Sequence, residues 1–259
     1  MKKLIISDLD GTLLDEKKNI SANDRNKIRA LIQEGHLFTI ATSRYYRTIR
    51  RCVGELGISI PVITSNGSLI YDFTEEKTVL VNVLDQEICS RVISYVLDKR
   101  YPLIAHTVAD MLITEGHPRI PSFRKGSFCP RISDFRTVSD PIYQFGLYTD
   151  DPGKTRREFA TLLKGYTVQV QISGKDIVVI TPENSSKGSA AEYLRQIASM
   201  KEDDLIVFGD DENDIPLFRQ TKHAVAMPDA CPALKELAEH VAVSGGDRVS
   251  YALETYYGL

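Results

Sequence analysis

The chain has 259 residues, of which 42% are hydrophobic and 26% are charged, and its formal net charge is −3. This is the composition of a globular protein with a sizeable core, and it excludes disordered and fibrous proteins. The near balance of charge leaves no basic footprint for nucleic acid or an anionic membrane, so neither is expected as a partner.

The cysteines show neither a zinc-binding spacing nor the density of a disulfide framework. They lie far apart, at Cys52, Cys89, Cys129 and Cys231. No apolar run is long enough to span a bilayer. The basic start of the chain leads into an apolar run that stops at Asp8, without a cleavage site. These features predict a cytoplasmic protein with reduced thiols.

The first part of the chain alternates short apolar runs with helical patterns. The runs that predict buried strands are Lys3–Ser7, Leu37–Ala41 and Pro61–Thr64. Between them, Ser21 can cap a helix that Gly35 ends, and a second helix is expected over Tyr46–Leu56. This alternation predicts a parallel sheet with right-handed crossovers.

The pattern changes after Gly67. Leu69–Val83 alternates like a hairpin, and helices are expected over Glu87–Asp98 and about Gly153–Leu163. Short strands are predicted among them at Leu103–Ala105, Met111–Thr114, Ile142–Tyr148, Thr167–Ile172 and Ile177–Ile180. This mixture predicts an α+β unit with antiparallel pairing.

The parallel pattern returns after Pro182. Helices are predicted at Lys187–Met200, Asp214–Arg219, Cys231–Glu239 and Asp247–Tyr256, and strands at Leu205–Phe208, His223–Ala226 and Val241–Val243. We therefore expect an α/β core made of residues 1–82 and 184–259, with a smaller unit inserted over residues 83–183.

Two carboxylates, Asp8 and Asp10, follow the first predicted strand in the run Asp-Leu-Asp-Gly-Thr. Residues two apart in an extended chain point to the same side. Two such carboxylates are readily ionised together only beside a cation, and oxygen ligands favour Mg²⁺. One could attack a phosphorus while the other transfers a proton. A strand-end turn that merely contains Asp and Gly fits the motif about equally well.

Three later segments fall at comparable places. Thr42-Ser43-Arg44 follows the second strand and could hold a phosphate oxygen, although it also fits a simple helix cap. Lys187 could neutralise the carboxylates, although most lysines are solvated. After Leu205–Phe208, an acidic turn contains Asp210, Asp211, Glu212, Asn213 and Asp214. A bound cation would remove the repulsion within this turn.

Five runs of the chain, in their order, resemble the motifs of the haloacid dehalogenase superfamily of phosphohydrolases. They are DLDGTLLD, ATSR, SNG, SKGSA and GDDENDIPLF. The similarity is greatest to its Cof-like, type IIB sugar phosphatases. It implies a Rossmann-like α/β core with a parallel sheet and an inserted α+β cap of type C2B. It also implies a Mg²⁺-dependent phosphomonoesterase that acts on small phosphorylated metabolites, chiefly sugar phosphates, through an aspartyl-phosphate.

The same resemblance assigns roles to individual residues. Asp8 would be the nucleophile and Asp10 the general acid/base. The metal would be held by Asp8, Asp10 through its backbone carbonyl, and Asp210, and Asp214 would orient these ligands. The residues implied to hold the phosphoryl group or balance its charge are Thr42, Ser43, Asn66, Lys187 and Asn213.

The chain departs from the family pattern at several positions without losing a catalytic group. Ser43 stands where a Gly is usual, as do Asp211 and Arg248, and Pro228-Asp229 replaces Gly-Asn. These departures bear on the orientation of the substrate.

The segment Gly116–Ser133 is basic and contains no acidic residue. We expect a loop-like segment, and one hypothesis is that it faces the active site and binds anionic substrates. The candidate substrate-binding residues are Arg44, Arg124 and Lys125. The alternative for the segment is a solvated loop.

Three other functions remain open at this point. The first is a phosphomutase or phosphotransferase of the same superfamily. The second is a signalling receiver domain, which the length of the chain disfavours. The third is a non-catalytic sensor of phosphorylated metabolites.

Overall fold

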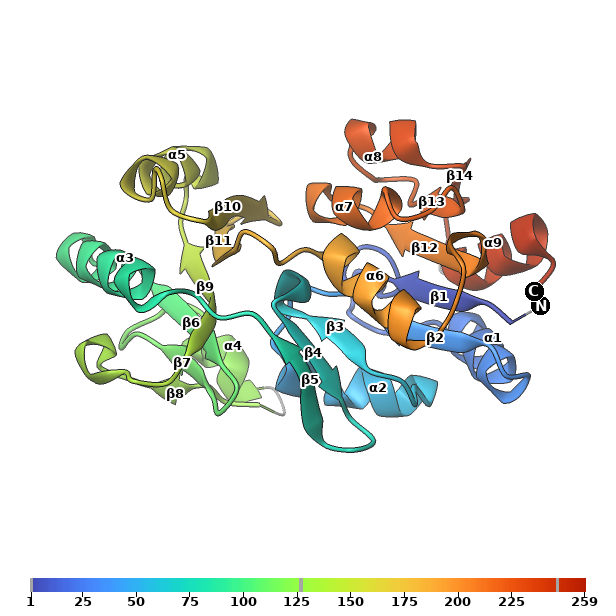
Figure 1. Cartoon of the computed structure of the whole chain (residues 1–259), viewed down its shortest axis with the longest axis horizontal. Helices are drawn as coiled ribbons and strands as arrows, with labels where there is room; N and C mark the ends of the chain where they lie inside the picture. The colour runs from blue at the N-terminus through green and yellow to red at the C-terminus, as the bar shows by residue number, and fades with distance from the viewer. Residues whose placement is uncertain (1, 126–127, 246) are drawn as a thin grey trace. The chain divides into compact units, whose positions relative to one another are not determined.

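The computed structural model describes residues 2–125, 128–245 and 247–259 (Figure 1). It divides into two compact units, one formed by residues 1–79 and 186–259 and the other by residues 80–185. The first unit contains a parallel sheet and the second a mostly antiparallel sheet, so the expected α/β class with an inserted α+β unit is confirmed.

The first unit is built on a five-stranded sheet with the strand order β14-β13-β12-β1-β2. Its strands are all parallel: β1 (Leu4–Ser7), β2 (Leu37–Ile40), β12 (Leu205–Gly209), β13 (Ala224–Ala226) and β14 (His240–Val241). Every residue of the central strands β1 and β12 is buried. A strand that is buried on both faces needs apolar side chains at consecutive positions. The continuous apolar runs in the sequence therefore predicted these strands.

The helices of this unit begin and end close to their predicted limits. They are α1 (Ala22–Gln33), α2 (Arg50–Leu56), α6 (Lys187–Ile197), α7 (Ile215–Phe218), α8 (Pro232–Leu237) and α9 (Arg248–Tyr257). The hydroxyl of Ser21 accepts a hydrogen bond from the backbone of Asp24 and caps α1. Gly57 ends α2 at φ 73°. The first turn of the predicted second helix, Tyr46–Ile49, is a 3-10 helix.

The third predicted strand, β3 (Val62–Thr64), differs from the expectation. A parallel bridge between Ala41 and Ile63, in which the Thr42 N–H donates to the Ile63 carbonyl at 3.0 Å, connects β3 to the chain after β2. β3 otherwise pairs antiparallel with β4 (Leu69–Asp72), in a separate three-stranded sheet completed by β5 (Lys77–Val81). The tight turn at Ser65–Gly67 reverses the chain, so the nearest free backbone groups of β3 are those of β4.

The second unit is a six-stranded sheet with the order β10-β11-β9-β6-β7-β8. Its strands are β6 (Leu103–Thr107), β7 (Met111–Ile113), β8 (Arg131–Ile132), β9 (Ile142–Tyr148), β10 (Val168–Ser173) and β11 (Ile177–Pro182). Helices α3 (Gln86–Lys99) and α5 (Pro152–Leu162) contribute Ile88, Val96 and Phe159 to a core shared with Phe145 and Leu147 of β9. The buried residues of each helix lie on one face, as in an amphipathic helix that packs on a sheet.

The basic segment of the second unit is not the loop that the sequence predicted, because it contains helix α4 (Ile120–Lys125) and strand β8. Two of its cations also have acidic partners. Arg119 lies 2.9 Å from Asp176, and Arg131 lies 3.3 Å from Asp110. These carboxylates come from distant parts of the chain, so the local sequence could not reveal them.

The side chains of Arg124 and Lys125 lie outside the described part of the structure. Their predicted role in substrate binding therefore remains a prediction.

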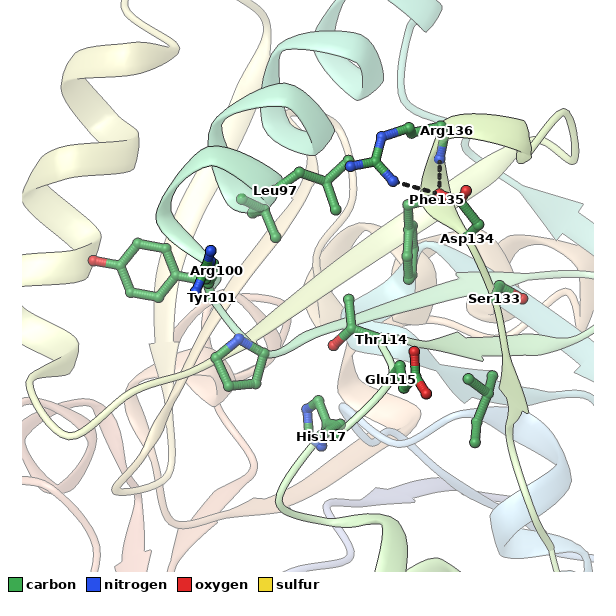
Figure 2. Close-up of a pocket in the computed structure, with 14 residues that line it drawn as sticks. Leu97, Arg100, Tyr101, Thr114, Glu115, His117, Ser133, Asp134, Phe135 and Arg136 are labelled. Atoms are coloured by element: carbon green, nitrogen blue, oxygen red, sulfur yellow. Dashed lines mark hydrogen bonds and ion pairs between the residues drawn. The ribbon is translucent and has the colours of Figure 1, made fainter.

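A cavity of about 540 Å³ lies within the second unit, beside the end of α3 (Figure 2). Charged side chains of both signs line it, and Arg136 bonds Asp134 at its wall with a separation of 3.3 Å. The buried His117 also lines it, and its Nδ1 accepts a hydrogen bond from the backbone of Arg119. None of the predicted catalytic residues lines this cavity.

Among the described residues, no helix combines the length and the apolar character that crossing a bilayer requires.

Gly188 in α6 provides a test of the packing that fixes Lys187. A Cβ at position 188 would lie 2.1 Å from the backbone oxygen of Pro216. We therefore expect Gly188→Ala to lower the free energy of unfolding by about 1–3 kcal/mol, measured by thermal or denaturant unfolding. The control is Gly54→Ala in α2, where a Cβ meets nothing within 4 Å. Because alanine has a higher helix propensity than glycine, Gly54→Ala should be neutral or stabilising. An equal decrease in the free energy of unfolding in the two variants would contradict the packing argument.

Candidate active site

Segments far apart in the sequence meet at the carboxyl ends of the parallel strands. Asp8 follows β1, Thr42 follows β2 and Asp210 follows β12, while Lys187 begins α6. In open α/β sheets this edge is where ligands bind. The parallel register of β1 with β2 and β12 brings Asp8, Thr42 and Asp210 to this edge, where Lys187 contacts Asp8.

Lys187 is the electrostatic centre of the site. Its side chain is 1% exposed, and its Nζ lies 2.6 Å from both Asp8 Oδ1 and Asp214 Oδ1. Burial alone would lower the pKa of Lys187, but the charges of Asp214 and Asp8 outweigh it and hold the pKa above its ordinary value. The lysine is therefore a fixed positive charge that orients both carboxylates.

Asp214 is held at both of its oxygens. Its Oδ1 accepts from Lys187, and its Oδ2 accepts from the backbone N–H groups of Asp210 (3.0 Å) and Asp211 (3.2 Å). A Cβ at Gly209 would lie 2.7 Å from the Asp214 side chain, so glycine is needed where this carboxylate folds back on its own loop. Asp214 thereby fixes the loop that contains Asp210.

Asp8 and Asp210 each keep one oxygen, Oδ2, without a hydrogen bond from the described residues. The other oxygen of Asp210 accepts from the Thr12 hydroxyl at 3.0 Å. One oxygen from each of Asp8, Asp210 and Asp214 lies within 4.8 Å of the others. Three carboxylates this close, two of which have an oxygen without a hydrogen bond from the described residues, fit a bound metal ion that would contribute the missing positive charge.

The carboxyl groups of Asp8 and Asp210 show the electrostatic cost of this arrangement. Burial, and then the neighbouring carboxylates, raise the pKa of Asp210 to about 6. Burial also holds the pKa of Asp8 well above its ordinary value, with Lys187 opposing the shift and Asp214 adding to it. Gly11 (φ 83°) lets the chain pass close to this pair, because a Cβ there would lie 2.2 Å from Asp210 Oδ2.

Asp10 lies in a different environment from Asp8. Its Oδ2 accepts from Arg44 Nε at 2.6 Å, and its Oδ1 accepts from Arg44 Nη2 at 2.6 Å and from Lys18 Nζ at 2.8 Å. Burial alone would raise the pKa of Asp10, but the hydrogen bonds and charges of Arg44 and Lys18 outweigh it and hold the pKa below its ordinary value. The structure thus gives Asp10 two cationic partners that Asp8 does not share.

The predicted phosphate-binding residues form an adjoining network. The backbone N–H of Asn66 donates to the carbonyl of Thr42, and Asn213 Nδ2 donates to Asn66 Oδ1, both at 3.0 Å. Asn66 adopts a left-handed conformation (φ 56°), and a Cβ at the following Gly67 would lie 2.1 Å from the carbonyl oxygen of Ser186. This turn therefore packs directly against the residue that precedes Lys187.

The structure also explains why the departures at Pro228 and Asp229 leave the acidic loop in place. The surrounding segment supports that loop through backbone groups, with Met227 N–H donating to the Gly209 carbonyl (3.0 Å) and Cys231 N–H to that of Asp210 (2.9 Å). These contacts do not depend on the side chains at positions 228 and 229.

The sequence analysis missed two residues of the site. Thr12 contacts Asp210, and it stands directly after the Asp-Leu-Asp-Gly run, where a hydroxyl could have been noticed. Lys18 contacts Asp10, but no local pattern distinguishes it from the neighbouring Lys17.

Comparisons with known proteins agree with this geometry. A family model for haloacid dehalogenase-like hydrolases matches residues 5–248. The Bacillus subtilis protein YwtE, named 5-amino-6-(5-phospho-D-ribitylamino)uracil phosphatase, is 27% identical over a gapped alignment of 280 positions that covers 97% of each chain.

Solved structures show the same fold over the whole chain. TM0651 from Thermotoga maritima is 26% identical, with a TM-score of 0.84 and coverage of 98% of this chain and 97% of that one. The subclass IIB sugar phosphatase BT4131 is 20% identical, with a TM-score of 0.87 and full coverage of both chains. The latter likeness concerns the fold alone, and it confirms the predicted resemblance at that level.

The raised pKa of Asp210 predicts how the site affects stability. A carboxyl whose pKa rises on folding, here from 3.8 to about 6, stabilises the fold while protonated, and this contribution is lost as the pH rises through about 6. In EDTA at pH 7, Asp210→Asn should therefore raise the free energy of unfolding by about 1–3 kcal/mol.

The measurement is the melting temperature of wild type and variant between pH 4 and pH 7. The gain should shrink towards pH 4, where Asp210 is largely protonated in the folded wild type. Asp150→Asn, at an exposed position of the second unit, is the surface control. A destabilised Asp210→Asn at pH 7 would show that the carboxylate is not under electrostatic strain.

Proposed function

The chain belongs to the haloacid dehalogenase-like hydrolases and is a phosphatase of that family. We propose that it hydrolyses small phosphomonoesters, chiefly sugar phosphates. The proposed reaction uses Mg²⁺ and passes through a phosphorylated Asp8. The observation that supports this most directly is the buried Lys187, ion-paired with Asp8 inside a cluster of three carboxylates. A purely structural ion pair would not need the two further unpaired carboxylate oxygens beside it.

Asp8 is the proposed nucleophile. Lys187 holds Asp8 Oδ1, and the second oxygen of this carboxylate accepts no hydrogen bond from the described residues. A new bond forms between this carboxylate and phosphorus as the bond from phosphorus to the leaving oxygen breaks. Lys187 cannot itself act as the base, because its pKa is held above the ordinary value.

Asp10 is the proposed acid and base. Its carboxyl proton passes to the leaving oxygen, which becomes the hydroxyl of the released alcohol. The resulting carboxylate then takes a proton from the water that attacks phosphorus, and the bond between phosphorus and Asp8 breaks. The cations Arg44 and Lys18 stabilise the carboxylate form of Asp10 and lower its pKa, so they favour the step in which Asp10 takes the proton from water.

The oxygen-rich donor set fits a hard divalent cation such as Mg²⁺. Asp8, Asp210 and the backbone carbonyl of Asp10 would hold it, with Asp214 fixing the loop that contains Asp210. When bound, Mg²⁺ supplies positive charge that offsets the negative charge of the phosphoryl group.

The remaining polar residues of the site would hold the phosphoryl oxygens. Thr42 and Ser43 follow β2, and Asn66 and Asn213 are linked to each other. Positioning of this kind is a large part of phosphoryl-transfer catalysis. The relative YwtE is named for a phosphorylated ribityl compound, which supports a small phosphorylated metabolite as the substrate class here.

The first test is phosphate release from a panel of phosphorylated metabolites, with and without Mg²⁺. We expect turnover that needs Mg²⁺ and falls by at least about 10³-fold in Asp8→Asn, because the amide cannot form the phosphorylated intermediate. Asp150→Asn is the matched surface control and should keep wild-type activity. Products are also examined for phosphate transferred to another hydroxyl. Transfer without phosphate release would contradict hydrolysis and indicate a phosphotransferase.

A further inference from the structure

We propose that Arg44 is a positioning residue that acts through Asp10 and does not bind the substrate. This assigns a different role from the substrate contact that the sequence suggested for Arg44. The inference rests on the proposed role of Asp10 as acid and base.

The contact between the two side chains has the geometry of an orienting pair. Arg44 Nε donates to Asp10 Oδ2 and Arg44 Nη2 donates to Asp10 Oδ1, each at 2.6 Å. Two parallel hydrogen bonds from one planar guanidinium fix the plane of a carboxylate as well as its position. A single contact, such as that of Lys18 Nζ at 2.8 Å, leaves the plane free to rotate.

Arg44 is itself held firmly enough to orient another residue. Its backbone N–H donates to the Thr42 hydroxyl at 3.2 Å, and its carbonyl accepts from the backbone of Ser65 at 3.0 Å. Its side chain is 28% exposed, whereas that of Lys18 is 58% exposed. The more exposed Lys18 contributes charge, and the more buried Arg44 contributes orientation.

The same contacts occupy one edge of the Arg44 guanidinium. The Nε and Nη2 donors of this edge both point at Asp10. A bidentate grip on a phosphoryl group by this edge would require Asp10 to be released. Asp10 must give a proton to the leaving oxygen and then take one from water, so its carboxyl has to stay near one position through both steps.

A double-mutant cycle separates the two roles. Wild type, Arg44→Met, Asp10→Asn and the double variant are compared by kcat and KM with p-nitrophenyl phosphate and with an alkyl phosphate. We expect Arg44→Met alone to lower kcat by about 10-fold to 100-fold and to change KM by less than about 3-fold. In the Asp10→Asn background the same substitution should change kcat by less than about 2-fold, because the group it orients is gone.

The leaving group provides a second readout that general loss of structure would not reproduce. An alkoxide needs a proton from Asp10 more than p-nitrophenolate does. Arg44→Met should therefore lower kcat more for the alkyl phosphate, as Asp10→Asn does. Arg44→Lys keeps the charge without the paired donors, and it should restore only part of kcat.

The control is Arg50→Met, which removes an arginine whose exposed side chain pairs with Glu76. It should leave kcat and KM unchanged. Melting temperatures confirm that the variants are folded, and turnover with enzyme in excess over substrate keeps the slow variants measurable.

The possible outcomes separate the inference from the proposed function. A slow Asp10→Asn with an unaffected Arg44→Met would overturn the inference alone. A rise in KM would indicate that Arg44 binds the substrate, and an equal loss of kcat in both backgrounds would show that it acts independently of Asp10; either result would overturn the inference. An Asp10→Asn variant with wild-type kcat for the alkyl phosphate would overturn the role of Asp10 and the inference with it.

Discussion

The buried ammonium of Lys187 is the interaction on which the rest of the site depends. A lysine that is 1% exposed is tolerated only because Asp8 and Asp214 both lie 2.6 Å from its Nζ. Removal of Lys187 would leave both of these buried carboxylates without their cation. The ion pairs join residues 8, 187 and 214, so the same contacts that fix the nucleophile also fasten the beginning of α6 and the acidic loop to the end of β1.

This arrangement is possible because backbone atoms come very close together around the charges. A side chain at Gly11, Gly188 or Gly209 would overlap Asp210, Pro216 or Asp214, respectively. The acidic loop is also held by backbone hydrogen bonds from Met227 and Cys231. Rigid support of this kind keeps carboxylates together that would otherwise repel one another, so electrostatic strain is built in where a cation can relieve it.

Much of this organisation could be predicted from the sequence, for a definite reason. Strands β1 and β12 are buried along their whole length, so their apolar runs stand out, and the residues after them must share one edge of a parallel sheet. Motif order then indicated that Asp8, Lys187 and Asp210 belong together. Two expectations differed from the structure for different reasons. The pairing of β3 with β4 follows from a local turn at Ser65–Gly67, whereas the partner of Arg119 is Asp176, far along the chain.

Asp8 and Asp10 show why spacing alone could not assign their environments. They are two residues apart and chemically identical, yet the pKa of Asp8 is raised and that of Asp10 is lowered. Asp8 is buried beside two further carboxylates, whereas Asp10 receives three hydrogen bonds from Arg44 and Lys18. Asp8, the proposed nucleophile, needs a cation to offset the negative charge around it, whereas Asp10, the proposed acid and base, already has two cationic partners. The two carboxyl groups are therefore suited to different roles. The fold determines these roles by the side chains that it places beside each carboxylate. Those side chains belong to residues 18, 44, 187, 210 and 214, and none of them is adjacent to the Asp-Leu-Asp-Gly-Thr run.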